Sequence, residues 1–545
     1  MRFLPVNLDA LLVELNDLDE TLALFDALMA DPVPGIEDIV PAARTLLIQF
    51  RPSTLERQAL VNRIANQDLS HRSVRDERRV EIPVHYTGED LHEVASLLHI
   101  SREEVIRRHT ATDYSVAFCG FAPGFAYLTG GAGFQVPRRQ TPRTRIPAGA
   151  VALAGDFSGV YPQASPGGWQ IIGVTPLQMW DLTRPEPALL RPGYRVRFID
   201  AGPLPANGLP SPSPSPSPSQ AESVVPAANT PCLEIITPGL QSVLQDLGRA
   251  GQTGQGVAAS GALDRGALRA ANRAVGNRSD MACVEVVLGG LSFVCHGRTV
   301  IAVTGAQTPL TITTASGLQW HPGNYQPVEL DDGDHVSLGS PKAGLRSYLA
   351  IRGGFDVAPV LGSLSTDTLA QVGPAALAAG DRLPFAAPVA GRSVSLSEAP
   401  AFELPGAGDI VTLDIVMGPR SDWFTQEALE RLSSQLWRVT AQSNRVGIRL
   451  TGERPLERSQ HQELPSEGTA VGAIQVPASG QPVLFLADHP LTGGYPVIAA
   501  VVSHHLDLAG QIPANARIRF NPLDEFDEIR PSAQAPLSTA DAKNP

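Results

Sequence analysis

The stretch RIPAGAVALAGDFSGVYPQASPGGWQIIGVT, residues 145–175, places short β-rich runs between six glycines and three prolines. Glycine lets the backbone take positive φ and approach a ligand closely, and proline fixes the turns. This punctuation predicts tightly turned β-strands of a barrel. It leaves two interpretations open, a wall of a ligand site or a barrel edge that binds nothing.

A second stretch near the end of the chain repeats this pattern. The run IPA at 146–148 corresponds to VPA at 476–478, and SPGGW at 165–169 corresponds to LTGGY at 491–495. The interval from Pro147 to Gly167 is 20 residues, and that from Pro477 to Gly493 is 16. We therefore predict two copies of one barrel motif, each with a Gly-Gly-aromatic edge. We expect the functional site where the two edges meet, with the halves associated within or between chains.

The length of 545 residues predicts three or four domains. The repeat SPSPSPSPS lies in residues 201–231, which we interpret as a semi-rigid linker of polyproline II type. Before it, residues 1–80 have the pattern of an α/β lobe and residues 81–200 that of a β-barrel. After it, residues 232–530 form the second half, and residues 531–545 are expected to be a disordered tail.

Composition excludes several classes of protein. The net charge of −13 argues against a nucleic-acid scaffold, because phosphate binding needs a concentrated basic face. Four cysteines without a CxxC pair, and no His cluster at zinc spacing, favour a metal-free protein of a reducing, cytoplasmic compartment. The N-terminal residues lack the pattern of a signal peptide, and no apolar run has the length of a membrane span.

Three local features each leave two interpretations open. Asp264 is placed to cap a helix after a Gly-rich loop, where free N–H groups could hold an anion, although no nucleotide-binding motif is present. Cys119 is interpreted as a buried structural thiol in preference to a nucleophile. The run DDGDH at 331–335 is interpreted as a hairpin turn in preference to a metal cluster.

Several motifs occur in a fixed order along each half. In the first half they are LLVEL at 11–15, RHT at 108–110, GFxPGFxY at 120–127, TPR at 141–143, PAG at 147–149 and SPGGW at 165–169. In the second half they are QDxGR at 245–249, GAxD at 261–264, AN at 271–272, Glu285, SNRxG at 443–447, SEG at 466–468, QVP at 475–477 and TGGYP at 492–496. By these motifs the first half resembles the KipI/allophanate hydrolase subunit 1 family. The second half resembles the KipA/allophanate hydrolase subunit 2 family.

The resemblance implies a mainly β fold with a small α/β N-terminal lobe. Cyclophilin-like β-barrels are expected, one in the first half and two in the second. It also implies ATP-dependent opening of 5-oxo-L-proline to L-glutamate, with Mg²⁺ accompanying ATP and a LamB/YcsF-type partner subunit. Neither nucleic acid nor a membrane is an expected partner. One alternative is a biotin-dependent carboxyltransferase of the urea carboxylase type, and another is a KipI-like kinase-inhibitory binding protein.

The same resemblance supplies candidate site residues. The catalytic candidates, of which the arginines would counter phosphate charge, are Arg143, Arg145, Asp246, Arg249 and Glu467. The substrate-binding candidates are Phe121, Pro123, Gly124, Phe125, Tyr127, Pro147, Gly149, Ser165, Gly167, Gly168, Trp169, Asp264, Asn272, Glu285, Gln475, Pro477, Thr492, Gly493, Gly494 and Tyr495. One departure concerns residues 361–369, LGSLSTDTL, where the family pattern LGSRST has an Arg in place of Leu364.

Overall fold

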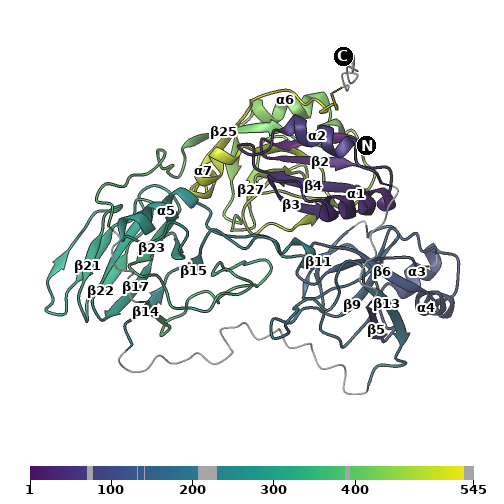
Figure 1. Cartoon of the computed structure of the whole chain (residues 1–545), viewed down its shortest axis with the longest axis horizontal. Helices are drawn as coiled ribbons and strands as arrows, with labels where there is room; N and C mark the ends of the chain where they lie inside the picture. The colour runs from purple at the N-terminus through teal and green to yellow at the C-terminus, as the bar shows by residue number, and fades with distance from the viewer. Residues whose placement is uncertain (70–77, 132, 140, 206–229, 387–392, 533–545) are drawn as a thin grey trace, which may run out of the picture.

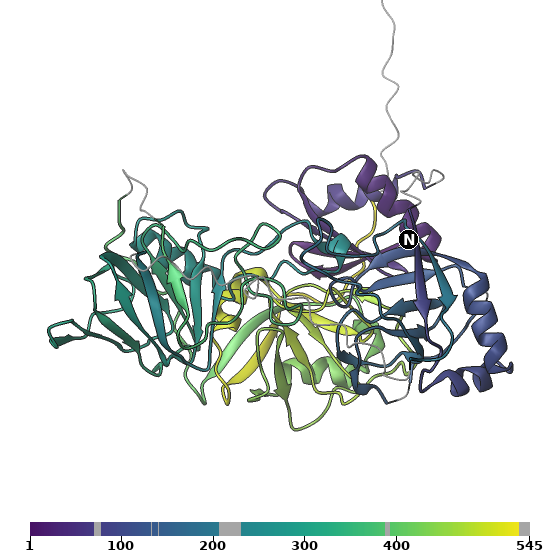
Figure 2. The same ribbon diagram turned by 90° about the horizontal axis from the view of Figure 1, so that it is seen from below.

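The structure is a computed structural model that describes residues 1–69, 78–131, 133–139, 141–205, 230–386 and 393–532. Most of the expected linker, and nearly all of the expected tail, lie outside the described residues. The described chain forms a small lobe, a first barrel, a two-sheet sandwich and a second barrel. Figure 2 shows the sandwich at one end, the second barrel in the middle and the first barrel at the other end.

The N-terminal lobe is an antiparallel sheet with two helices, and its strand order is β1-β2-β4-β3. Its elements are β1 (Arg2–Asn7), β2 (Ala10–Glu14), α1 (Leu18–Ala30), β3 (Ile36–Pro41), β4 (Thr45–Phe50) and α2 (Arg57–Ala65). Helix α1 starts after Asp17, whose carboxylate accepts a hydrogen bond from the Glu20 amide. Apolar side chains of the helices and of one sheet face form the core of this lobe.

The first barrel has the strand order β12-β9-β10-β7-β6-β13-β5, and reciprocal backbone hydrogen bonds between His85 and Val174 bring its two end strands together. Its elements are β5 (Arg79–Val84), α3 (Leu91–Leu97), α4 (Arg102–Ala111), β6 (Asp113–Cys119), β7 (Ala126–Thr129), β9 (Ala150–Ala154), β10 (Phe157–Val160), β12 (Gln170–Val174) and β13 (Arg195–Asp200). Ser101 caps α4 by accepting a hydrogen bond from the Glu104 amide, which is the pattern of a capping box. Beside the barrel, β8 (Arg143–Ile146) and β11 (Ser165–Gly167) form a separate two-stranded sheet.

The sandwich opens the second half, and its two sheets enclose one apolar core. One sheet has the order β20-β19-β22-β17-β14-β24 and the other the order β15-β16-β23-β18-β21. The elements are β14 (Cys232–Pro238), β15 (Gln241–Gln245), η1 (Thr253–Gln255), α5 (Arg265–Ala274), β16 (Cys283–Val287), β17 (Leu291–His296), β18 (Thr299–Gly305), β19 (Leu310–Thr313), β20 (Gln319–Trp320), β21 (Val328–Leu330), β22 (His335–Leu338), β23 (Arg346–Ile351) and β24 (Arg382–Pro384).

The second barrel is closed, with the order β25-β32-β29-β30-β27-β26-β33. Its elements are β25 (Ile410–Met417), η2 (Ser421–Trp423), α6 (Gln426–Ser434), β26 (Trp437–Val439), β27 (Gly447–Thr451), β29 (Ala473–Gln475), β30 (Val483–Phe485), β32 (Val497–Val501), η3 (Ser503–His505), α7 (Leu506–Gly510) and β33 (Arg517–Pro522). Here too a two-stranded sheet stands beside the barrel, formed by β28 (Glu467–Gly468) and β31 (Thr492–Gly493).

The two barrels have the same topology. When β5 is matched to β25, β12 to β32 and so on along the chain, the neighbour order of one barrel reproduces that of the other. In each barrel the first strand pairs in parallel with the last, β5 with β13 and β25 with β33. The mainly β, barrel-containing fold class is confirmed, and so is the duplication predicted from the repeated Gly-Gly motif. The expected count of two barrels in the second half is wrong, because strands β14–β24 form two separate sheets that pack as a sandwich.

The acidic run 331–335 forms a turn, but the predicted hairpin is wrong. Strand β21 belongs to the five-stranded sheet and β22 to the six-stranded sheet, so the turn joins the two layers of the sandwich. Within it the Asp331 amide donates to the Asp334 carboxylate at 2.9 Å. The Asp-Gly pair gives the turn but does not determine whether the flanking strands pair with each other.

The N-terminal lobe packs against the second barrel, as the purple and the green-to-yellow elements show in Figure 1. Strand β1 contacts β25 and β32, and β4 contacts β28. One buried apolar cluster joins Leu4, Leu12 and Leu47 to Ala470 and Leu491. The segment after β33 returns to the lobe and bridges to β1. The two halves are thus docked on each other within one chain.

Candidate functional site

The two Gly-Gly edges lie in the two-stranded sheets beside the barrels. In the first, Gly167 on β11 is opposite Arg143 on β8. In the second, Gly493 on β31 is opposite Glu467 on β28. Because the barrels share one topology, Arg143 and Glu467 occupy corresponding positions. Both were predicted as catalytic candidates from the sequence, which does not reveal this correspondence.

Each of these residues forms an ion pair with a residue that follows the first strand of its barrel. Arg143 donates to both carboxylate oxygens of Asp90 at 2.8 Å, and Arg420 donates through Nε to both oxygens of Glu467 at 2.9 and 3.0 Å. Asp90 and Arg420 also correspond, since each backbone N–H donates to the barrel strand after its edge, at 3.0 and 3.1 Å. The second pair therefore repeats the first with the charges exchanged.

Burial and these partners shift the pKa of each carboxylate in opposite directions. Burial alone would raise the pKa of Asp90, but hydrogen bonds from Arg143 and the Ile171 amide outweigh it and lower that pKa. For Glu467 burial dominates and raises the pKa, although Arg420 opposes the shift. Arg143 and Glu467 are thus both engaged by an internal partner of opposite charge. Their proposed catalytic roles stay predictions.

The second ion pair also joins the two halves of the chain. Arg420 donates through Nη2 to Glu14 of the N-terminal lobe at 2.8 Å, and its side chain is only 4% exposed. Glu14 in turn accepts from Arg2 at 2.6 Å. Glu467 therefore belongs to the junction between the halves. Its position in the sequence does not reveal this location.

Arg138 lies between the two edges and was not among the predicted site residues. Its Nε is 2.8 Å from Glu463, and its Nη2 donates to the Ser466 hydroxyl at 3.1 Å. A Cβ added at Gly494 would overlap the Arg138 guanidinium. A Cβ added at Gly168 would lie 3.9 Å from the Cβ of Arg138. Both Gly-Gly edges therefore approach this one side chain. The paired arginines at 138–139 were the available sequence signal.

Close contacts also join the first barrel to the second edge. The Tyr127 hydroxyl lies 3.3 Å from the hydroxyls of both Ser466 and Thr492. A Cβ at Gly120 would lie only 2.6 Å from the Thr492 hydroxyl. Glycine at position 120 therefore allows the first barrel to approach Thr492 this closely. The Gly124 amide donates to the Gln255 carbonyl at 2.9 Å, which adds a contact from the sandwich loop.

The aromatic candidates of the first edge pack on one another behind the edge. Phe125 contacts Trp169 and Tyr127 edge-to-face, with ring centroids 5.3 and 5.2 Å apart, and Phe121 packs on Phe125. Phe125, Tyr127 and Trp169 are all buried. They are the core that supports the edge. In contrast, Tyr495 of the second edge is 37% exposed and has the Arg458 guanidinium 5.6 Å from its ring centre.

The remaining edge candidates are placed as follows. A Cβ at Gly149 would overlap the Thr175 carbonyl, and one at Gly167 the Tyr161 hydroxyl, so both positions require glycine. Gln475 donates to the Tyr495 carbonyl at 3.1 Å. Arg145 and Pro147 are exposed, Ser165 is half-buried, and Pro123 and Pro477 are on loops that follow β6 and β29. Arg145 is thus the catalytic candidate of the first half that faces solvent.

Asp246 and Arg249 organise the loop that contains Leu364. The Asp246 carboxylate accepts from the hydroxyls of Ser363 and Ser365, both at 2.6 Å, and from the Leu364 amide at 2.7 Å. Arg249 is buried and donates to the Ser365 carbonyl, and burial lowers its pKa. The backbone of Leu364 is therefore held in place, although its side chain lacks the charge of the arginine in the family pattern.

The other second-half candidates are interior residues. Glu285 accepts from Arg445 at 2.5 Å and from the Tyr348 hydroxyl at 2.8 Å. Asn272 donates to the Leu268 and Met281 carbonyls. Through Arg445, Glu285 joins the sandwich to the second barrel, whereas the hydrogen bonds of Asn272 lie within the sandwich. Their motifs in the sequence do not reveal this structural role.

The N-terminus of helix α5 is the place where the sequence allowed an anion site. In the structure, carboxylates of the protein accept the hydrogen bonds of its first amides. Asp264 accepts from the Ala267 amide at 2.8 Å. Asp507 accepts from the amides of Arg265 and Gly266 at 3.0 and 2.9 Å. Burial and the neighbouring Asp507 raise the pKa of Asp264 to about 7. The anion-binding interpretation is therefore wrong, because these N–H groups already have acceptors.

Comparison with known proteins assigns both halves. Residues 1–190 match the family described as carboxyltransferase domain, subdomain C and D, and residues 255–522 match carboxyltransferase domain, subdomain A and B. The chain is 34% identical over 295 residues to the C subunit of 5-oxoprolinase from Escherichia coli, covering 53% of this chain and 90% of that protein. It is 39% identical over 186 residues to the B subunit of 5-oxoprolinase from Bacillus subtilis, covering 31% of this chain and 77% of that protein.

Two further comparisons extend this result. The chain is 35% identical over 309 residues to urea amidolyase of Saccharomyces cerevisiae, covering 53% of this chain but only 16% of that protein. The crystal structure of TTHA0988 superposes with a TM-score of 0.79 at 35% identity, covering 94% of this chain and 99% of that chain. Among the described residues, no helix has the length and apolar character needed to cross a membrane. The chain belongs to the carboxyltransferase-domain family that includes the B and C subunits of 5-oxoprolinase, and it carries both kinds of half on one polypeptide.

Proposed function

We propose that this chain is the fused B and C component of an ATP-dependent 5-oxoprolinase, which opens 5-oxo-L-proline to L-glutamate together with a LamB/YcsF-type subunit. The observation that carries the proposal is the consecutive match of one chain to both of these 5-oxoprolinase components, each over most of its length. The docking of the two halves within the chain supports it. ATP, with Mg²⁺, would be a co-substrate.

The chemistry explains why ATP is needed. A lactam resists water because its amide is stabilised by resonance. Transfer of the γ-phosphoryl group to the lactam oxygen releases ADP, and water then adds to the carbonyl carbon. The ring nitrogen leaves with a proton, which gives an acyl phosphate, and a second water hydrolyses this to L-glutamate and phosphate. The protein must therefore stabilise negative charge on the transferred phosphoryl group and on the attacked carbon's oxygen.

The junction of the two Gly-Gly edges is the proposed place for this substrate. Arg138 lies against both edges, and Arg145 is exposed on the first. These two arginines, together with backbone N–H groups of the edges, are suited to a carboxylate or a phosphoryl group. Arg143 and Glu467 would act indirectly, since each fixes the strand opposite a glycine of its edge.

The test is an assay of the full chain with a LamB/YcsF-type subunit. We expect glutamate release from 5-oxo-L-proline only when ATP is present, and a fall of about 10- to 100-fold in kcat/KM for Arg138→Ala. Arg51→Ala, which removes an exposed arginine of the N-terminal lobe, is the matched control and should leave the rate unchanged. Absence of ATP-dependent glutamate from the wild-type mixture would exclude the proposed activity.

A second candidate function is a carboxyltransferase of the urea carboxylase type, favoured by the similarity of the second half to urea amidolyase. In that case the junction would accept carboxybiotin and urea, and the biotin would be carried by another chain. The distinguishing experiment supplies carboxylated biotin and urea to the purified chain. Formation of allophanate would support this candidate, and its absence alongside glutamate release would reject it.

A further inference from the structure

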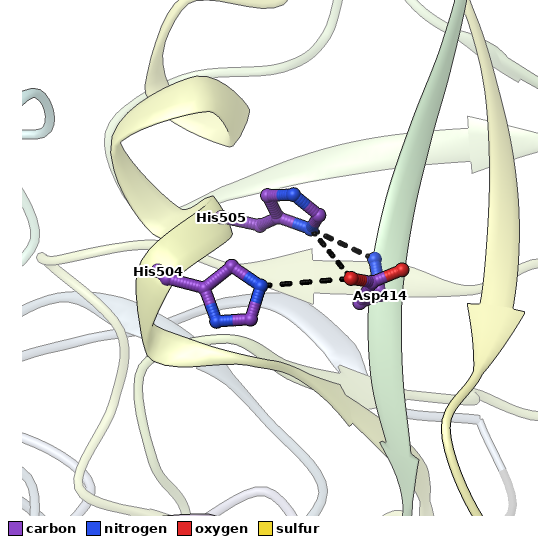
Figure 3. A group of neighbouring side chains, drawn as sticks. All are labelled: Asp414, His504 and His505. Carbon is purple, nitrogen blue, oxygen red and sulfur yellow. Dashed lines mark hydrogen bonds and ion pairs between the residues drawn. The ribbon is translucent and has the colours of Figure 1, made fainter. Parts of the chain in front are cut away.

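The second barrel contains a group of metal-ligating side chains away from both Gly-Gly edges. Asp414 lies on β25, while His504 and His505 lie on the short helix η3 that follows β32. Their ligand atoms are all within 4.8 Å of one another. Figure 3 shows both imidazole rings directed toward the Asp414 carboxylate. Among the described residues, this is the group of three such side chains that converges on one point.

The distances suit a small divalent ion. His504 Nε2 is 3.5 Å and His505 Nδ1 is 3.8 Å from the same oxygen, Oδ2 of Asp414. Zinc binds imidazole nitrogen and carboxylate oxygen at about 2.0–2.2 Å, so tetrahedral ligand atoms are separated by about 3.4 Å. The observed spacings therefore require only small side-chain adjustments around such an ion.

The surrounding hydrogen bonds direct the ligand atoms. Asn521 donates to Oδ1 of Asp414 at 2.7 Å, which leaves Oδ2 facing the two imidazoles. The Asp414 amide donates to Nδ1 of His505 at 2.9 Å, so this nitrogen is unprotonated and its lone pair is engaged by the amide. On metal binding this hydrogen bond would be exchanged for the metal–nitrogen bond.

The residue types agree with this geometry. Two imidazoles and one carboxylate are a ligand set for zinc and related transition metals, whereas Ca²⁺ and Mg²⁺ prefer oxygen ligands.

We propose that Asp414, His504 and His505 form a binding site for a divalent transition-metal ion of the zinc class, with the remaining coordination position taken by water. The ion would join β25 to η3. The neighbouring residue Ser503 donates to the Asp9 carboxylate of the N-terminal lobe at 2.5 Å. The site thus braces the turn through which the second barrel contacts the first half, and it is independent of the chemistry proposed for the edges.

The experiment is a titration of the full chain, prepared without a polyhistidine tag and freed of metal by a chelator, with ZnCl₂ by calorimetry. Co²⁺ absorption in the visible range provides a second readout of nitrogen ligation. We expect one ion per chain with a micromolar or tighter Kd. We also expect at least about tenfold weaker binding in His504→Ala and in Asp414→Asn, because each loses one of three ligands.

His504 is 58% exposed, so its replacement is not expected to affect folding, and circular dichroism checks this. His321→Ala, which removes an exposed histidine of the sandwich, is the matched control and should bind zinc as the wild type does. No saturable uptake by the wild type would overturn the proposal. Uptake that is unchanged in both ligand variants, or that is lost equally in His321→Ala, would overturn it as well.

Discussion

Replacing Arg420 with alanine should weaken the association of the two halves. The Arg420 side chain is 4% exposed and is paired with Glu467, which is 9% exposed, and with Glu14, which is 16% exposed. Removing one partner of a buried ion pair costs about 3–5 kcal/mol, because the remaining charge is left without compensation. Glu14 keeps its bond to Arg2, so we expect the lower end, about 3 kcal/mol. This corresponds to about a 150-fold weaker association.

The assay uses a protease site inserted in residues 206–229, so that the halves can be separated after folding. Their dissociation constant is then measured by analytical ultracentrifugation for the wild type and for Arg420→Ala. The matched control is Arg51→Ala, whose ion pair with Glu37 is exposed on both sides and should contribute less than about 1 kcal/mol. A dissociation constant for Arg420→Ala within threefold of the wild type would refute the reasoning.

The pH dependence of this variant gives a second check. Burial already raises the pKa of Glu467 above its ordinary value, and loss of Arg420 should raise it further. A carboxyl group with a raised pKa in the folded state binds a proton more readily there than in the unfolded chain. The free-energy cost of burying the ionised Glu467 carboxylate is therefore present at neutral pH. It is relieved as the pH falls through the folded-state pKa. The difference in dissociation constant between Arg420→Ala and the wild type should therefore become smaller as the pH is lowered.

Three other predictions concern separate regions. Gly120→Ala should weaken association of the halves by about 1–3 kcal/mol, because its Cβ would crowd Thr492, whereas Gly254→Ala, with open space around it, should not. A dissociation constant unchanged by Gly120→Ala would contradict this. All four cysteines are buried, and burial raises the pKa of Cys119 to about 12, so the native thiols should react slowly with Ellman's reagent at pH 8 and fully after unfolding. Rapid native reaction would contradict their burial. Leu364→Arg should fold normally, because the contact of residue 364 with Asp246 is made by its backbone amide. In the assay of the proposed 5-oxoprolinase activity this variant should have a higher kcat/KM than the wild type, and an unchanged value would contradict a role for an arginine at this position.

Local sequence patterns predicted the fold well where the chain obeys local rules. The Pro and Gly-Gly spacing indicated two related barrels, and each barrel contains the strands expected between those residues. Glycines at positions 149 and 167 were recognised as turn or close-contact residues, and side chains at both would overlap neighbouring atoms. The hairpin at 331–335 failed because an Asp-Gly turn fixes only its own four residues and not the sheet that each strand joins.

The site was less predictable because its contacts are distant in the sequence. Arg143 looked like a free anion-binding side chain, but Asp90, 53 residues earlier, neutralises it. The corresponding pair in the second barrel has exchanged charges, so a comparison of residue types hides the relationship between Arg143 and Glu467. Asp414 and His505 are 91 residues apart, which no metal-spacing rule includes. Such groupings follow from topology.

The return of the C-terminal segment to the first strand has a consequence for the order of the two halves in the gene. Phe3 pairs with Ile529, and the Arg530 carbonyl accepts from Gln58, so both described ends of the polypeptide meet on one lobe. The backbone therefore runs almost as a closed ring. A circularly permuted gene that starts at residue 230, joins residue 532 to residue 1 through a short peptide and stops at residue 205 would encode every contact described above. The contacts described above thus do not depend on which half comes first in the gene.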